Sequence, residues 1–108
     1  MKANLSFLLF LFPFFLSAQT QTIRGALRDQ QAETPLIGAT VQLLSASGET
    51  QQGAMTDADG QFTLQNVPVG RQVLRVTYLG YEPLTVPNIL VTAGKEVLLD
   101  LKLQESFS

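Results

Sequence analysis

Short runs of alternating apolar and polar residues, each closed by a turn signal, constrain this chain more than any other feature. Phe62 and Leu64 alternate with polar neighbours between two such signals, residues 57–60 (Asp-Ala-Asp-Gly) and 67–70 (Val-Pro-Val-Gly). Alternation with a period of two is typical of a half-buried β-strand. In the second signal, Pro68 favours the φ angle that a tight turn needs and the glycine closes it. Together with the alternating run that follows at residues 74–78, this stretch therefore predicts two short strands joined by tight turns.

The same alternation recurs along most of the chain. The expected strands lie at residues 23–28, 39–43, 50–56, 61–65, 74–78 and 97–103, with two short extended pieces at 84–86 and 88–91. About seven short strands with frequent turns, and no helical period, predict an all-β chain that forms a single antiparallel β-sandwich. Residues 50–56 are poor in apolar side chains, which indicates an edge strand. One shared core is expected from Ile23, Leu27, Val41, Leu43, Phe62, Leu64, Leu74, Val76, Tyr78, Val97, Leu99 and Leu101.

Residues 1–18 read as a targeting segment. Lys2 precedes an apolar run at residues 5–16, and Ser17 and Ala18 offer small residues for cleavage. This layout predicts a secretory signal peptide. The alternative, a membrane anchor, needs about 20 apolar residues, and this run is shorter and contains a proline. We therefore expect a signal peptide at 1–18, a folded domain at 19–104 and an unstructured tail at 105–108, with no membrane-spanning segment after cleavage.

The composition excludes several classes of chemistry. The 108 residues contain no Cys, no His and no Trp, so a disulfide framework, a catalytic triad with histidine and an imidazole zinc site are impossible. The formal net charge is −2, which gives no electrostatic basis for nucleic-acid binding. No catalytic, cofactor-binding or metal-binding residue is predicted, and the chain is expected not to be an enzyme.

One segment superficially resembles a calcium-binding loop. Asp57, Asp59 and Gly60 have the spacing of its start, but Pro68 occupies the position where a bidentate glutamate belongs. The favoured interpretation is a hairpin turn in which Asp57 binds local amides and Gly60 adopts a positive φ.

Two tyrosines and the dispersed charges are the other candidates. Tyr78 and Tyr81 could form a stacking platform for a sugar. Tyr78 has inward parity, however, and we expect Tyr81 to cover the end of the core with its hydroxyl at the surface. The acidic residues Glu49, Glu82, Glu96 and Asp100, and the basic residues Arg24, Arg28, Arg71 and Arg75, are scattered through the chain and read as solvated surface charges.

Four segments in a characteristic order resemble the carboxypeptidase regulatory-like domains, a transthyretin-like β-sandwich family. They are residues 23–25 (Ile-Arg-Gly), 35–41 (Pro-Leu-Ile-Gly-Ala-Thr-Val), 56–62 (Thr-Asp-Ala-Asp-Gly-Gln-Phe) and 67–70, the last running into 76–81 (Val-Thr-Tyr-Leu-Gly-Tyr). The Tyr-Leu-Gly-Tyr ending looks most like the N-terminal extension of TonB-dependent outer-membrane nutrient receptors. In such receptors, the module would lie in the periplasm, ahead of the plug and barrel. The chain departs from that pattern by ending at Ser108.

The resemblance implies a non-enzymatic periplasmic or outer-membrane-associated accessory module. Such a module would be the N-terminal extension of a TonB-dependent receptor, or a stand-alone relative, and would act by protein–protein contact with a partner in the cell envelope. Strand addition along residues 50–56 is one means of such contact. Two alternatives stay open. One is a carbohydrate-binding module, since the fold is related to carbohydrate-binding folds, and the other is a regulatory appendage associated with a carboxypeptidase.

Overall fold

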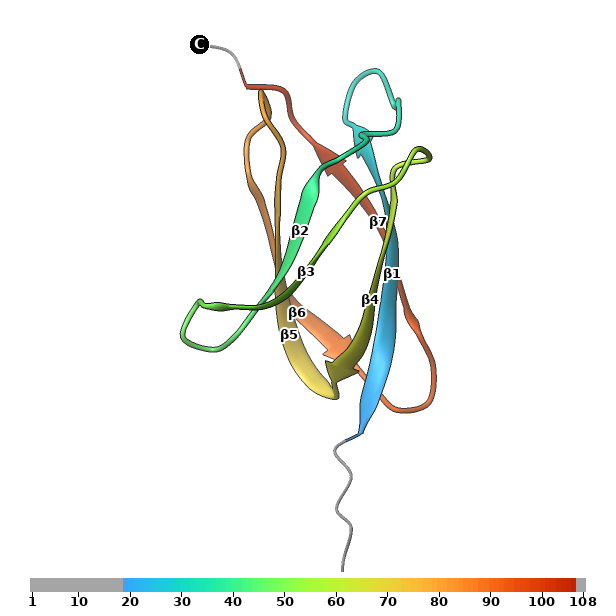
Figure 1. The fold of residues 1–108 in the computed structure, drawn as a ribbon, viewed down its shortest axis with the longest axis vertical. Coiled ribbons are helices and arrows are strands. Elements are labelled where there is room, and N and C mark those ends of the chain that lie inside the picture. The colour runs from blue at the N-terminus through green and yellow to red at the C-terminus, as the bar shows by residue number, and fades with distance from the viewer. Residues whose placement is uncertain (1–18, 107–108) are drawn as a thin grey trace, which may run out of the picture.

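The computed structural model describes residues 19–106, so the predicted signal peptide and the last two residues lie outside the described part. Seven strands make up the fold (Figure 1): β1 (Thr20–Asp29), β2 (Thr40–Leu44), β3 (Thr50–Met55), β4 (Gln61–Pro68), β5 (Gly70–Thr77), β6 (Leu84–Val91) and β7 (Val97–Leu103). They confirm the predicted all-β fold. Among residues 19–106, we find no helix with the length and apolar character needed to cross a membrane.

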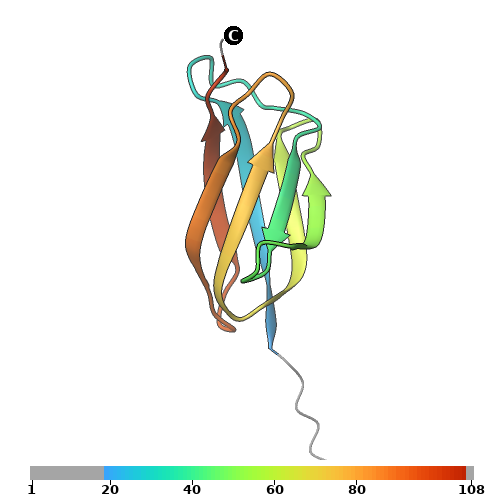
Figure 2. The ribbon, with the colours of Figure 1, turned by 90° about the vertical axis from the view of Figure 1, so that its left-hand side faces the viewer.

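The strands form two sheets that pack face to face. Sheet A has the order β4-β1-β7 and sheet B the order β3-β2-β5-β6. Figure 2 shows sheet B toward the viewer with sheet A behind it. All pairings are antiparallel except that of β1 with β7, which is parallel and sets Leu27 beside Leu101. The turn between β6 and β7 lies at the end of the sandwich where β1 begins, so β7 runs back in the direction of β1 (Figure 1).

The interior is filled by the residues of inward parity. Eight of the twelve predicted core residues are buried, and the other four, Tyr78, Val97, Leu99 and Leu101, are partly buried and pack against them. The core also contains six residues that the prediction did not include: Leu36, Ala39, Val67, Ile89, Val91 and Leu103. The shared core is therefore confirmed and is larger than expected.

Two β-bulges explain part of that difference. Asn66 and Asn88 both have a φ of 59°. Near Asn66, the register between β1 and β4 shifts by one residue, so Val67 turns inward after Leu64. A similar shift joins the two extended pieces predicted at 84–86 and 88–91 into the single strand β6. A bulge adds one residue to one strand, which resets the alternation beyond it.

Candidate interaction site

The turn at residues 57–60 is held by a single carboxylate. Asp57 Oδ1 accepts the backbone amides of Asp59 and Gln61, each at 2.9 Å. Gly60 has a φ of 74°, and a Cβ at this position would lie 2.7 Å from the Leu27 carbonyl oxygen. The predicted turn, with its amide-binding aspartate and positive-φ glycine, is confirmed. It is not a hairpin, however, because β3 and β4 belong to different sheets and the turn carries the chain between them.

The tyrosine pair is built into the end of the sandwich. The ring centroids of Tyr78 and Tyr81 are 5.5 Å apart, with the planes inclined at 46°. The Tyr81 hydroxyl donates to Asp29 Oδ2 at 2.5 Å, while Asp29 Oδ1 accepts the amides of Gln31 and Ala32 at 2.8 Å. Tyr81 is partly buried and packs against the core, as expected, and its hydroxyl is bound to Asp29. A hydroxyl already bound to a carboxylate, on tilted rings, does not provide a flat sugar-stacking platform.

Sequence reasoning ended the first strand at residue 28 and missed Asp29, which is the last residue of β1. Asp29 is only 7% exposed. The hydrogen bond from Tyr81, followed by those from the two amides, lowers the pKa of Asp29. The same bond to Asp29 raises the pKa of Tyr81 to about 12. Nothing local in the sequence signals this pair, because the partners are 52 residues apart.

The charges that the sequence left scattered divide between the sheets. On sheet A, Arg24 Nε lies 2.9 Å from Glu96, and Arg28 Nη2 lies 2.9 Å from Asp100. Glu49 lies in the β2–β3 connection and Glu82 in the β5–β6 connection, at opposite ends of the sandwich (Figure 1). Sheet B carries the exposed residues Arg71 and Arg75 on β5, and none of its strands contains an acidic residue. The structure therefore does not bring the four predicted acidic residues together.

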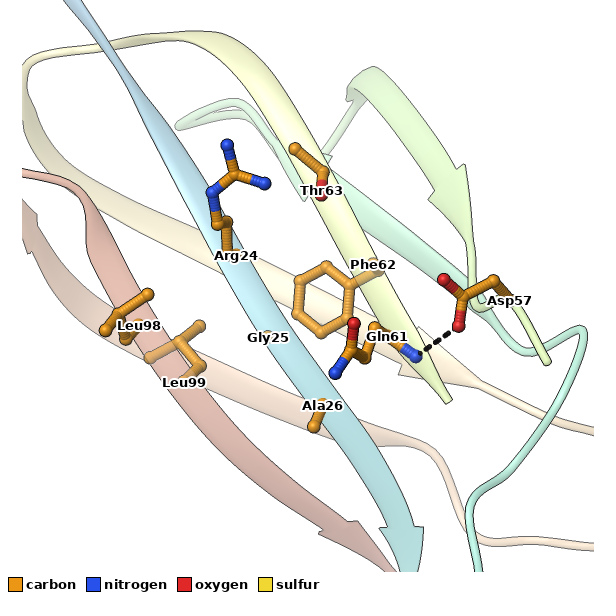
Figure 3. Close-up of a pocket in the computed structure, with 9 residues that line it drawn as sticks. All are labelled: Arg24, Gly25, Ala26, Asp57, Gln61, Phe62, Thr63, Leu98 and Leu99. Atoms are coloured by element: carbon orange, nitrogen blue, oxygen red, sulfur yellow. Dashed lines mark hydrogen bonds between the residues drawn. The ribbon is translucent and has the colours of Figure 1, made fainter. Parts of the chain in front are cut away.

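A shallow hollow of about 320 Å³ crosses the three strands of sheet A (Figure 3). Arg24, Thr63 and Leu98 line it from β1, β4 and β7, and the Phe62 ring lies over Gly25 beside it. The hollow is open to solvent, and Arg24 already binds Glu96. Asp57 and Gln61 also line it, but Asp57 Oδ1 already accepts two backbone amides, so few polar groups are left to orient a small ligand. Within residues 19–106, no group of three acidic side chains is placed to hold a metal ion.

The free strand edges are the remaining candidates for interaction. β3 and β6 end sheet B, so residues 50–55 form an edge strand as predicted. β3 carries no charged residue, and its Met55 side chain is 65% exposed. β6 is interrupted by Pro87 and its bulge, which obstruct strand addition. β3 contains no proline, and its register shift against β2 falls at Gln51, outside residues 52–55, so β3 is the more open edge of sheet B.

The direction of the backbone groups shows which residues of β3 could form hydrogen bonds with a further strand. The Thr56 amide donates to the Ala39 carbonyl at 3.0 Å, so Thr56 faces β2. Backbone groups alternate in direction along a strand, which turns the amides of Met55 and Gly53 away from β2. Gln52, in contrast, donates its side-chain amide to the Gln65 carbonyl of β4 at 3.0 Å and ties the two sheets together. The available groups of the edge therefore belong to residues 53 and 55.

Comparison with solved structures supports the fold. The chain is similar to the TIE protein of Bacillus anthracis, with 19% identity and a TM-score of 0.61, over 81% of this chain and 17% of that one. It is similar to a chain of a type II cohesin–X-dockerin complex from Acetivibrio cellulolyticus, with 25% identity and a TM-score of 0.60, over 75% of this chain and 56% of that one. It is also similar to the major pilin BcpA of Bacillus cereus, with 16% identity and a TM-score of 0.64, over 82% of this chain and 31% of that one.

The chain thus spans from 17% to 56% of the length of these three neighbours. No curated protein matches it. A family model does match, over residues 22–104, and it describes the carboxypeptidase regulatory-like domain. The match spans all the segments on which the resemblance rests, and the two-sheet sandwich agrees with it. The chain belongs to the carboxypeptidase regulatory-like domain family.

Proposed function

We propose that this chain is a non-enzymatic accessory module of the cell envelope that acts by protein–protein contact. Residues 1–18 would direct export, and residues 19–104 would form the working domain in the periplasm. The module would be the N-terminal extension of a TonB-dependent outer-membrane nutrient receptor, or a stand-alone relative of one. The family assignment and the Tyr-Leu-Gly-Tyr turn after β5 support this context.

The uncharged β3 edge carries the proposal of protein contact. Its unpaired backbone groups can continue sheet B into a strand of a partner, as in other cases of β-strand addition. Neither Gly53 nor Met55 opposes an incoming strand with charge, and charge is a common protection of natural edges. Similar structures include a pilin and a cohesin–X-dockerin complex, which agrees with a module that contacts other proteins.

Substitution of Gly53 gives a direct test. Gly53→Pro removes an outward amide, and proline is tolerated on an edge strand when its nitrogen faces solvent. Gly53→Ala is the matched control, because it keeps the amide and its Cβ would meet only the Val41 carbonyl oxygen, at an ordinary 3.5 Å. Proline at Gln52 would be a poorer test, since that residue faces β2 and binds Gln65.

The measurement is affinity capture from solubilised envelopes, with the captured proteins identified by mass spectrometry. We expect the wild type and Gly53→Ala to recover a TonB-dependent receptor or its complex, and Gly53→Pro to recover much less of it. Equal recovery by all three proteins would rule out docking at β3. Recovery of envelope proteins that include no such receptor would rule out the receptor context.

A further inference from the structure

The free edge of β7 has features that β3 lacks. β7 ends sheet A and runs for seven residues without proline or bulge, and within residues 19–106 it pairs only with β1. The Gln30 amide donates to the Leu103 carbonyl at 2.9 Å, so Leu103 faces β1. Alternation along the strand then turns the backbone groups of Lys102, Asp100 and Leu98 toward the open side. These three residues could bond to a further strand.

The side chains along this edge are unusually apolar for an exposed strand. Leu98 is 75% exposed on the outer face of sheet A. Leu99 and Leu101 point toward the core but remain only partly buried. Exposed Leu98, together with the incompletely covered Leu99 and Leu101, leaves aliphatic surface beside unpaired backbone groups, which favours association with another strand.

The charged residues of β7 indicate which strand could pair with its free edge. In an antiparallel pairing of β7 with a second copy of itself, a twofold axis at Leu101 sets Asp100 of each chain opposite Lys102 of the other. Both side chains then lie on the outer face, and both residues belong to the set whose backbone groups point outward. An axis at residue 100 would oppose two aspartates, and an axis at residue 102 would oppose two lysines. Like charges directly opposite one another destabilise a sheet, so among the registers that oppose the charged residues of β7 to each other, charge selects the one centred on Leu101.

We propose that the protein forms a homodimer through antiparallel pairing of β7 with its copy, in the register centred on Leu101. The two three-stranded A sheets join into one continuous sheet. The inward residues Leu99 and Leu101 gain cover from the partner strand, while Asp100 accepts from the partner's lysine as well as from Arg28, which lies 2.9 Å away. This surface is separate from the β3 edge, so the dimer and the proposed partner contact can exist together.

The test is the mass of the purified wild-type protein in solution, by sedimentation over about 1 µM to about 1 mM, because single-edge interfaces are small and weak. We expect a reversible dimer. Lys102→Asp opposes two pairs of acidic residues and should weaken dimerisation about tenfold or more. Arg75→Asp makes the same charge change on sheet B and should leave dimerisation unaltered.

Mixing two variants controls for a folding defect, because only folded chains can restore the dimer; circular dichroism of each variant confirms its fold beforehand. Asp100→Lys chains carry lysine at both positions, and Lys102→Asp chains carry aspartate at both. Each variant alone should be monomeric, and their mixture should form a heterodimer that restores all the opposed charges. A monomeric wild type at the highest concentration would overturn the proposal. So would a wild-type dimer that both charge variants retain, or variants that fail to associate on mixing, because another surface would then be responsible.

Discussion

Phe62 occupies space that Gly25 leaves open, and this pair permits a quantitative test of the core. Phe62 is 3% exposed, and a Cβ built on Gly25 would lie 2.4 Å from Phe62 Cζ and 2.5 Å from Cε1. Contacts this short do not occur, so the ring can lie over β1 only because residue 25 has no side chain. β1 and β4 set the two residues opposite each other.

Removing the ring should be costly. Truncation of a buried phenylalanine to alanine destabilises proteins by about 3–5 kcal/mol. The 88 residues from 19 to 106 correspond to a total stability of about 4–13 kcal/mol. We therefore expect Phe62→Ala to lower the free energy of unfolding by a large fraction, visible as a lower urea midpoint with an unchanged slope.

The double-mutant cycle is the sharper measurement. Gly25→Ala alone should cost about 1–3 kcal/mol, because the new Cβ displaces the ring. In a Phe62→Ala background, the nearest neighbour left is the Leu99 carbonyl oxygen at 3.2 Å, so Gly25→Ala should cost much less. The coupling between two such residues in contact is about 0.5–3 kcal/mol. Additive effects, or an unchanged midpoint for Phe62→Ala, would show that the ring does not lie over residue 25.

Three further predictions follow from other parts of the chain. The Tyr81–Asp29 bond should stabilise the fold between an acid and an alkaline limit of pH. Its contribution is lost in acid as the pH falls through the lowered pKa of Asp29. It is lost in alkali as the pH rises from about 10 toward the raised pKa of Tyr81, about 12. Tyr81→Phe should abolish the alkaline loss, which thermal unfolding against pH would reveal. Gly60→Ala should cost about 1–3 kcal/mol more than Gly48→Ala in urea unfolding, since both have positive φ but only position 60 is crowded; equal losses would argue against the close approach. Intact mass of the exported protein should correspond to cleavage near Ala18, and a retained leader would contradict it.

Local pattern accounts for most of the strands. Alternation at Phe62 and Leu64, or at Leu74 and Val76, is decided by neighbours in sequence, because successive side chains of a strand point to opposite faces. The same reasoning identified residues 50–56 as an edge, since their side chains are too polar or small to be covered on both faces. This reasoning failed at the bulge at Asn66, because one added residue reverses which face of the sheet the following side chains of β4 point to.

The tertiary structure alone decided which distant groups meet. Arg24 and Glu96 are 72 residues apart, and only the parallel pairing of β1 with β7 brings them together. Tyr81 and Asp29 meet because the β5–β6 turn lies beside the end of β1, at a separation of 52 residues. The sequence by itself determined the class of fold and the residues that can form its interior. Pairing order, register and the availability of each edge were decided by contacts between segments, since a strand's own residues specify its faces but not its neighbours.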